Sequence, residues 1–172
     1  MEFMKILAPE TIVTGLNVKD KAEALDQMAE LFVKAGNIND KTQFIKDVYV
    51  REEIGETGVG NYIAIPHGKS EAVVTPGVAI AVLDHEIEWE SLDDTGAKVI
   101  ILFAVGTDNE AAMEHLKLLA MFSKRLGDDA VVAKLIGAGS VEDVIKALTE
   151  EAEDAEEETE EEDIDLDDIT IM

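Results

Sequence analysis

The seven residues from Val99 to Val105 are all apolar, so the run has no polar side that could face water. A strand with one wet face alternates apolar and polar residues, whereas a strand that is apolar on both faces must be covered on both. The run is also too short to cross a bilayer. It therefore predicts the central strand of a sheet that carries helices on each face. The need to cover both faces limits the possible folds more than any other feature of the sequence.

The segments around this run are predicted to supply the covering helices and the other strands. Amphipathic spacing and capping residues predict helices over residues 20–34, 40–53, 110–126, 128–136 and 141–148. Apolar or alternating runs predict strands ending near residue 65 and over residues 78–83 and 86–90. We therefore expect an α/β fold, a single layered domain over residues 1–148 with a small mixed β-sheet flanked by helices on both sides.

Charge is concentrated at the C-terminal end of the chain. The 172 residues include 39 acidic and 14 basic ones, a net charge of −25. Residues 149–172 hold 14 of the acids and no base, which leaves 25 acids against the same 14 bases, or −11, for residues 1–148. A segment this charged cannot bury enough apolar surface to order itself. Residues 149–172 are therefore expected to form an acidic, disordered tail.

The composition also excludes several classes of protein. Nucleic acids and anionic membrane surfaces are bound by Lys and Arg, which are scarce in this chain, so neither is an expected partner. The chain has no cysteine and therefore no disulfide framework or thiolate chemistry. Residues 1–5 lack the features of a signal peptide, and no apolar run is long enough for membrane insertion. We expect a cytoplasmic protein.

His67 stands in a setting that suits a reactive side chain. It follows the apolar run Ile63–Ile65 and Pro66, and Gly68 comes directly after it. Proline cannot donate to a sheet ladder, so Pro66 is expected to end the strand and to stiffen the chain in front of the histidine. Gly68 is expected to leave space beside the imidazole. The pattern predicts a ring on a rigid support with one open side.

The other two histidines have less distinctive surroundings. His115 shares a helical stripe with Leu118, Leu119 and Phe122, and a histidine in such a stripe is more often a packing residue than a ligand. The loop before its helix follows the central strand, and ligand sites commonly lie beyond strand ends. His85 lies in a turn beside two acids and is expected to be solvated.

Three chemistries could use His67 and His115. A metal site could add Glu114, although no His-Glu-x-x-His motif is present, and a nucleophilic triad would lack both a cysteine and a Gly-x-Ser-x-Gly serine. A phosphohistidine needs a neutral imidazole together with a cation and hydrogen-bond donors for the phosphoryl oxygens. Arg51, Thr57 and the glycine-rich residues 55–60 could provide them. The residues alone leave the metal site and the phosphohistidine open.

The stretch from Arg51 to Lys69, R-E-E-I-G-E-T-G-V-G-N-Y-I-A-I-P-H-G-K, resembles the phosphohistidine signature of enzyme IIA domains in the fructose–mannitol family. These domains belong to the bacterial sugar phosphotransferase system, and the resemblance covers nearly all of residues 4–148. It implies that His67 is phosphorylated through Nε2, that His115 is the second active-site histidine and that Arg51 neutralises the phosphate.

Two positions depart from the family pattern. Asn61 stands where some members carry an acid, and Tyr62 stands where glycine is common, which is expected to reshape the rim of the pocket.

The resemblance implies a phosphotransferase that works between proteins. HPr would donate the phosphoryl group to His67, and an enzyme IIB domain would accept it for the uptake of a fructose- or mannitol-type sugar. Thr57 would add a hydroxyl donor for the phosphate, and neither a cofactor nor a metal is implied. Two alternatives remain, a regulatory phosphocarrier of the nitrogen-related branch and, from another class, a metal-dependent hydrolase.

Overall fold

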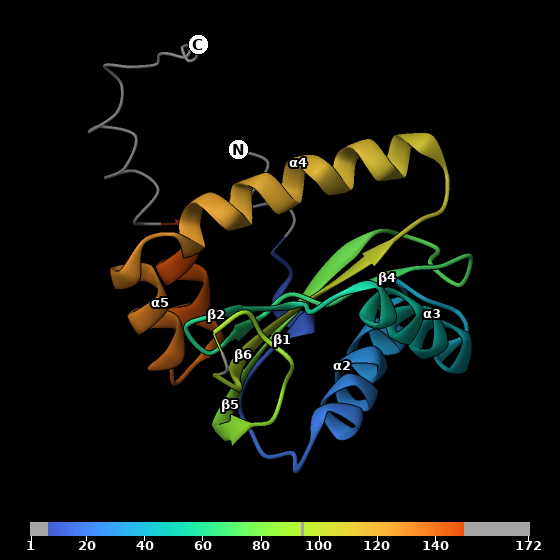
Figure 1. Cartoon of the computed structure of the whole chain (residues 1–172). Coiled ribbons are helices and arrows are strands. Elements are labelled where there is room, and N and C mark those ends of the chain that lie inside the picture. The colour runs from blue at the N-terminus through green and yellow to red at the C-terminus, as the bar shows by residue number, and fades with distance from the viewer. Residues whose placement is uncertain (1–6, 94, 150–172) are drawn as a thin grey trace, which may run out of the picture.

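The computed structural model describes residues 7–93 and 95–149 and contains a six-stranded mixed sheet (Figure 1). The strand order is β1 (Ile12–Leu16), β5 (Gly77–Ile87), β6 (Ala97–Val105), β3 (Ile63–Ala64) and β2 (Gly58–Gly60), and β4 (His67–Lys69) also pairs with β6. The β1–β5, β3–β6 and β4–β6 pairs are parallel, whereas β2–β3 and β5–β6 are antiparallel. The predicted mixed sheet is confirmed.

Strand β6 is the predicted central strand. It pairs with β5 along one edge and with β3 and β4 along the other. Its side chains alternate between two cores, with Val99, Ile101 and Phe103 in one and Ile100 and Leu102 in the other, and none of these is more than 1% exposed. The run is apolar throughout because both faces of the sheet are covered.

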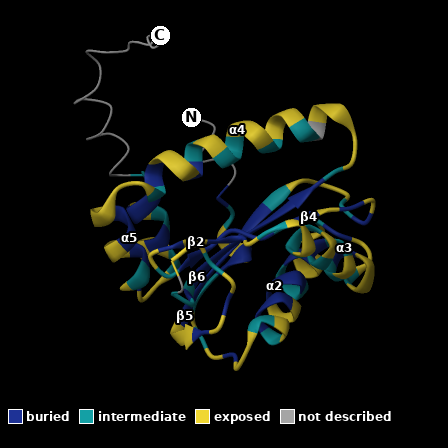
Figure 2. Ribbon diagram, in the orientation of Figure 1, coloured by how far each residue is buried: buried dark blue, intermediate teal, exposed yellow. Residues whose placement is uncertain are grey.

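Helices lie on both faces of the sheet, as predicted. The short 3-10 helix η1 (Pro9–Thr11) leads into β1, and α2 (Lys21–Ala35) and α3 (Lys41–Ile54) pack on one face. The other face is covered by α4 (Asn109–Leu126), α5 (Asp129–Ile136) and the helical residues 141–149. Figure 2 shows the buried residues gathered along the sheet and the exposed ones on the outer helix faces.

The helix ends form where local sequence signals predict them. The Asp20 carboxylate accepts a hydrogen bond from the Glu23 N–H at 2.9 Å, and Asp40 caps α3 in the same way. Gly36 ends α2 with a φ of 86°, which favours glycine because the residue has no Cβ. Asp128 caps α5.

Several short strands differ from the prediction. Strand β1 was not expected, and residues 78–83 and 86–90 were expected as two strands, but β5 runs unbroken to Ile87. The glycine-rich residues 58–60, for which no strand was predicted, form β2, and His67 lies in β4, beyond the point where Pro66 was expected to end the strand. Strands β1 and β4 are set by pairing with distant residues, such as His67 with Phe103, and such pairing leaves no local pattern. Strand β2 pairs with the neighbouring β3 but has only three residues.

Gly68 has a different role from the one predicted. A Cβ added to Gly68 would lie 2.3 Å from Cε1 of Phe44 and 2.9 Å from Cγ2 of Val48, both on α3. Its missing side chain therefore lets α3 approach β4 closely and does not serve to make room for the imidazole. This close packing brings the C-terminal end of α3 to the strand that carries His67.

Candidate active site

The structure brings His67 of β4 and His115 of α4 into contact. Their ring centroids are 4.7 Å apart and their planes meet at 79°, an edge-on arrangement. The ring of Phe103 on β6 packs against both imidazoles, with centroids 5.6 Å from His67 and 5.1 Å from His115. His115 therefore belongs to a two-histidine cluster, although its helical stripe alone favoured a packing role.

One nitrogen of each imidazole has unused hydrogen-bonding capacity. Nε2 of His67 and Nδ1 of His115 are closed off from solvent, and neither has a hydrogen-bond partner within the described residues. A buried polar atom without a partner costs about 1–3 kcal/mol, so such atoms are uncommon and point to a functional constraint. Nε2 of His67 is the atom that the family resemblance implies as the site of phosphorylation.

Burial keeps both rings neutral. It lowers the pKa of His67 from 6.5 to about 4, and two charges act in the same direction, that of protonated His115 and that of Arg51, which is always present. Burial also lowers the pKa of His115, with a smaller effect from the Lys69 ammonium. A neutral imidazole keeps a nitrogen lone pair, so His67 can act as a nucleophile near neutral pH without first losing a proton.

Arg51 lies in the last turn of α3, and its charge acts on the His67 ring. Its Nη1 donates to the carbonyl oxygen of Gly55 at 3.1 Å, which holds the guanidinium over the start of the glycine-rich loop. A guanidinium has five N–H donors in a planar fork. Of the three residues predicted for the site, His67 and His115 are thus in contact, and the charge of Arg51 acts on His67.

Thr57 is placed differently from the prediction. Its side chain is buried, and its hydroxyl donates to Oε2 of Glu52 at 2.6 Å while accepting from the Trp89 indole N–H at 3.1 Å. A hydroxyl has one proton to donate, and here that proton goes to Glu52. The geometry therefore gives no support to Thr57 as a hydroxyl donor for the phosphate.

Asn61 and Tyr62, the two departures from the family pattern, form the turn between β2 and β3. Both have positive φ angles, 56° and 68°. Their N–H groups donate to the Asp93 carboxylate and to the Thr95 hydroxyl, so the turn is held by the loop between β5 and β6. Hydrogen bonds from Thr95, and from the Asn61 N–H, lower the pKa of Asp93 to about 2.

The remaining candidates do not join the site. His85 is exposed and lies 2.6 Å from the Asp84 carboxylate, which agrees with the predicted solvated position. Glu114 is exposed beside Lys117, with 3.9 Å between their charged atoms. Within residues 7–93 and 95–149 no three His, Asp or Glu side chains converge as metal ligands. The structure therefore gives the metal-dependent hydrolase no ligand set.

Three residues near the site were not singled out from the sequence. Lys69 acts on the pKa of His115, and its position two residues after His67 on one strand is a signal that could have revealed it. Phe103 is paired with His67 across two strands, and Glu52 is linked to the site through Thr57. Neither of these contacts leaves a signal in the local sequence.

Comparison with known proteins identifies a family. The family model described as phosphoenolpyruvate-dependent sugar phosphotransferase system, EIIA 2, matches residues 5–151. No helix in the described part of the chain is long and apolar enough to span a membrane.

Two curated relatives carry different names. The PTS system 2-O-alpha-mannosyl-D-glycerate-specific EIIABC component of Escherichia coli (strain K12) is 32% identical over 128 residues, 74% of this chain and 20% of that protein. This chain thus spans about a fifth of that relative. The nitrogen regulatory protein of Klebsiella oxytoca is 30% identical over 151 residues, 87% of this chain and 91% of that protein.

A solved structure shares the fold. It is the complex of enzyme IIAMTL and phosphorylated enzyme IIBMTL from Escherichia coli, which matches with a TM-score of 0.71 at 24% identity. The match covers 84% of this chain and 97% of that one.

Proposed function

The chain belongs to the EIIA type 2 family of the phosphoenolpyruvate-dependent sugar phosphotransferase system, and from this membership we propose that His67 carries a phosphoryl group between two proteins. Domains of this family are phosphotransfer components. The observation that carries the proposal is the contact between two neutral imidazoles, 4.7 Å apart, beside the guanidinium of Arg51.

Transfer onto His67 is an in-line displacement. The lone pair of His67 Nε2 forms a new N–P bond while the bond between phosphorus and the donor imidazole of phospho-HPr breaks, and the donor ring keeps that electron pair. Negative charge on the three equatorial oxygens is met by the N–H donors of Arg51 and His115. Both nitrogen–phosphorus bonds are of similar energy, so the exchange needs no cofactor.

The attacking nitrogen is covered in the present conformation. Because Nε2 of His67 is closed off from solvent and the His67 and His115 rings meet edge-on, we propose that one imidazole turns before transfer. Such a turn is a side-chain motion, which is fast compared with domain movement. We propose that docking of the donor accompanies it.

The partners are HPr as donor and an enzyme IIB domain as acceptor. The EIIABC name of the relative and the IIAMTL–IIBMTL complex support the second. Helices α3 and α4 expose apolar side chains close in sequence to Arg51 and His115, and each is more than half exposed: Val50, Ile54, Met113 and Leu116. They suit a protein partner more than a small substrate. We place this cycle in the cytoplasm, in keeping with the cysteine-free composition.

The destination of the phosphoryl group distinguishes two candidate functions. We favour uptake of a fructose- or mannitol-type sugar, in which His67 passes the group to a IIB domain. The match to a nitrogen regulatory protein over 91% of its length favours the second candidate, a regulatory phosphocarrier. Capture of partners by the phosphorylated and the unphosphorylated chain separates them, because a transport component should hand phosphate to IIB and show no other state-dependent partner.

Phosphoryl uptake from HPr tests the shared part of the proposal. The full chain is incubated with enzyme I, HPr and phosphoenolpyruvate, and its intact mass is followed. We expect the chain to gain one phosphoryl group, His67→Ala to gain none, and His85→Ala, a change at an exposed histidine, to behave as the wild type. Uptake by His67→Ala equal to that of the wild type would contradict the proposal.

A further inference from the structure

A network of buried and partly buried hydrogen bonds joins the end of α3 to the loop in front of His67. Glu52 follows Arg51 on α3, and its side chain is only 7% exposed although it carries a carboxylate. Oε2 of Glu52 accepts from the Thr57 hydroxyl at 2.6 Å, and Oε1 accepts from the Lys21 ammonium at 2.6 Å. Trp89 completes this hydrogen-bond network, because its indole N–H donates to the Thr57 hydroxyl.

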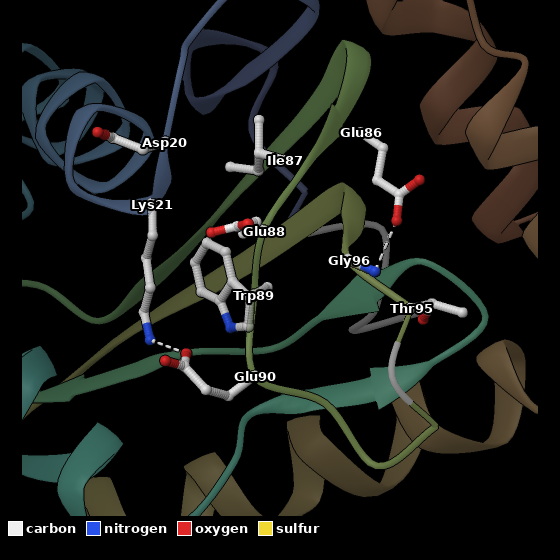
Figure 3. Close-up of a pocket in the computed structure, with 9 residues that line it drawn as sticks. All are labelled: Asp20, Lys21, Glu86, Ile87, Glu88, Trp89, Glu90, Thr95 and Gly96. Carbon is white, nitrogen blue, oxygen red and sulfur yellow. Dashed lines mark hydrogen bonds and ion pairs between the residues drawn. The ribbon is translucent and has the colours of Figure 1, made fainter.

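The outer end of this hydrogen-bond network is the ion pair of Lys21 with Glu90, which packs on the ring of Trp89. Nζ of Lys21 lies 2.8 Å from the Glu90 carboxylate and 4.9 Å from the centroid of the Trp89 ring (Figure 3). A buried carboxylate is tolerated only where its partners replace the lost water. Both oxygens of Glu52 have such partners, one from α2 and one from the loop.

Thr57 connects this hydrogen-bond network to the segment that carries His67. Its carbonyl oxygen accepts from the N–H of Ile65 at 2.8 Å, two residues before His67. Arg51 holds the same loop from its other end through the carbonyl of Gly55. The loop is therefore fixed at Gly55 to the guanidinium of Arg51. At Thr57 it is fixed to Ile65, in the segment that leads to His67.

We propose that Glu52 is a positioning residue for phosphoryl transfer, acting through Thr57 to hold the His67 segment in register with Arg51. The inference rests on the proposed function of His67. Glu52 acts without touching the phosphoryl group, and its effect is geometric, because a displacement of about 1 Å in a reacting pair can cost a factor of about a hundred in rate.

Two changes at Thr57 test the hydroxyl. Thr57→Val keeps the shape and removes the hydrogen bonds, whereas Thr57→Ser keeps the hydroxyl. We expect Thr57→Val to slow phosphorylation of His67 at saturating phospho-HPr by about tenfold, the equivalent of one lost buried hydrogen bond. Thr57→Ser should stay within about threefold of the wild type. The KM for phospho-HPr should not change, because neither variant alters the docking surface.

Changes at Glu52 separate positioning from direct phosphate binding. Lys21 and Thr57 donate to different oxygens of Glu52, and Glu52→Gln replaces one of these oxygens by an NH2 group, which cannot accept a hydrogen bond. We expect this variant to be slowed several-fold and the double variant Glu52→Gln/Thr57→Val to be no slower than Thr57→Val alone, because both changes break one linkage. If Thr57 bound the phosphate directly, Glu52→Gln would leave the rate unchanged.

A matched control and a spectroscopic readout complete the test. Glu53→Gln makes the same change at the next residue, which is exposed, and should behave as the wild type. Trp89 is the only tryptophan of the chain, so its near-ultraviolet circular dichroism reports the loss of the Thr57 bond in Thr57→Val and Glu52→Gln but not in Glu53→Gln. Every variant should still reach one phosphate per chain, which shows that it is folded.

The outcomes are distinct. A wild-type rate for Glu52→Gln, or single effects that multiply in the double variant, would overturn the inference while leaving the role of His67 in place. A wild-type chain that takes no phosphate from phospho-HPr would overturn the proposed function and the positioning role together.

Discussion

His67 can act as a nucleophile because its ring stays neutral, and burial is the main cause. Burial lowers the pKa of His67 to about 4, and the charge of Arg51, or of His115 when that ring is protonated, lowers it further. The guanidinium that would hold a transferred phosphate thus also keeps protons off the attacking ring. One cluster of residues prepares both the nucleophile and the site for the group that it receives.

Stability should depend on pH through this ring. Between about pH 6.5 and 4 the unfolded chain binds a proton at His67 that the folded ring does not, so acidification favours unfolding. The free energy of unfolding is expected to fall across this window by at most about 3 kcal/mol from His67, which makes no contribution at higher pH. Urea unfolding of the wild type and His67→Gln measures it. Curves of equal slope against pH would contradict the assignment.

Arg51 should not be replaceable by lysine. A lysine ammonium is a point charge and cannot match the planar fork that a guanidinium offers to phosphoryl oxygens. We expect Arg51→Lys to slow phosphoryl uptake from phospho-HPr by at least about tenfold while thermal unfolding changes little. Stopped-flow or quench-flow mass analysis gives the rate. An unchanged rate would remove Arg51 from the transfer step.

The residues that we propose to touch the phosphoryl group could be named from the sequence, but the residues that support them could not. Arg51 and His67 belong to one continuous signature, and His115 lies on a helix with clear periodicity. The partners of Glu52 and Thr57 are 31 and 32 residues away, at Lys21 and Trp89. Such pairs become visible only when the fold brings the elements together, which is why Thr57 was predicted to face the phosphate.

Among the elements, the contact between α3 and β4 matters most for the site. It brings the helix that carries Arg51 against the strand that carries His67, and it depends on the missing side chain of Gly68, where Phe44 and Val48 fill the space that a Cβ would need. The position of β4, which has only three residues, is thus determined by its packing against α3.

Gly68→Ala should therefore disturb both stability and transfer. The added methyl would lie 2.3 Å from Cε1 of Phe44, so α3 or the ring must shift. We expect a loss of about 1–3 kcal/mol in the free energy of unfolding and a slower phosphoryl uptake. Urea unfolding is the measurement, and Gly139→Ala, where a Cβ meets nothing within 4 Å, is the control. Equal stability of the two variants would show that α3 is not held by this contact.

Helices were predicted better than strands for a physical reason. The caps Asp20, Asp40 and Asp128 act on N–H groups two or three residues away, so their signals lie within the helix sequence. The strands β2 and β4 have three residues each, and β4 is defined by its pairing with β6, more than 30 residues along the chain. Regions that short have no periodicity of their own to recognise.

In the whole molecule, the site draws on both layers of the fold. Arg51 comes from α3 on one face of the sheet, His115 comes from α4 on the other face, and His67 comes from the sheet between them. A small relative movement of the two layers would therefore change the site. This arrangement suits a carrier that must accept the phosphoryl group from one protein and release it to another.

The acidic tail should be dispensable for transfer. Residues 150–172 lie outside the described residues, and the family match ends at residue 151. We propose that residues 1–148 are the functional domain and expect removal of residues 152–172 to leave the rate of phosphoryl uptake and the thermal midpoint unchanged. Calorimetry and quench-flow mass analysis of both chains measure this. A slower truncated chain would assign the tail a role in transfer or docking.

Locating the phosphoryl group within the chain tests whether a single imidazole carries it. The full chain is phosphorylated with enzyme I, HPr and phosphoenolpyruvate, digested at alkaline pH to preserve phosphohistidine, and its peptides are sequenced by mass spectrometry. We expect a single acid-labile phosphate on His67. A phosphate on His115, on His85 or on a non-histidine side chain, with His67 unmodified, would contradict it.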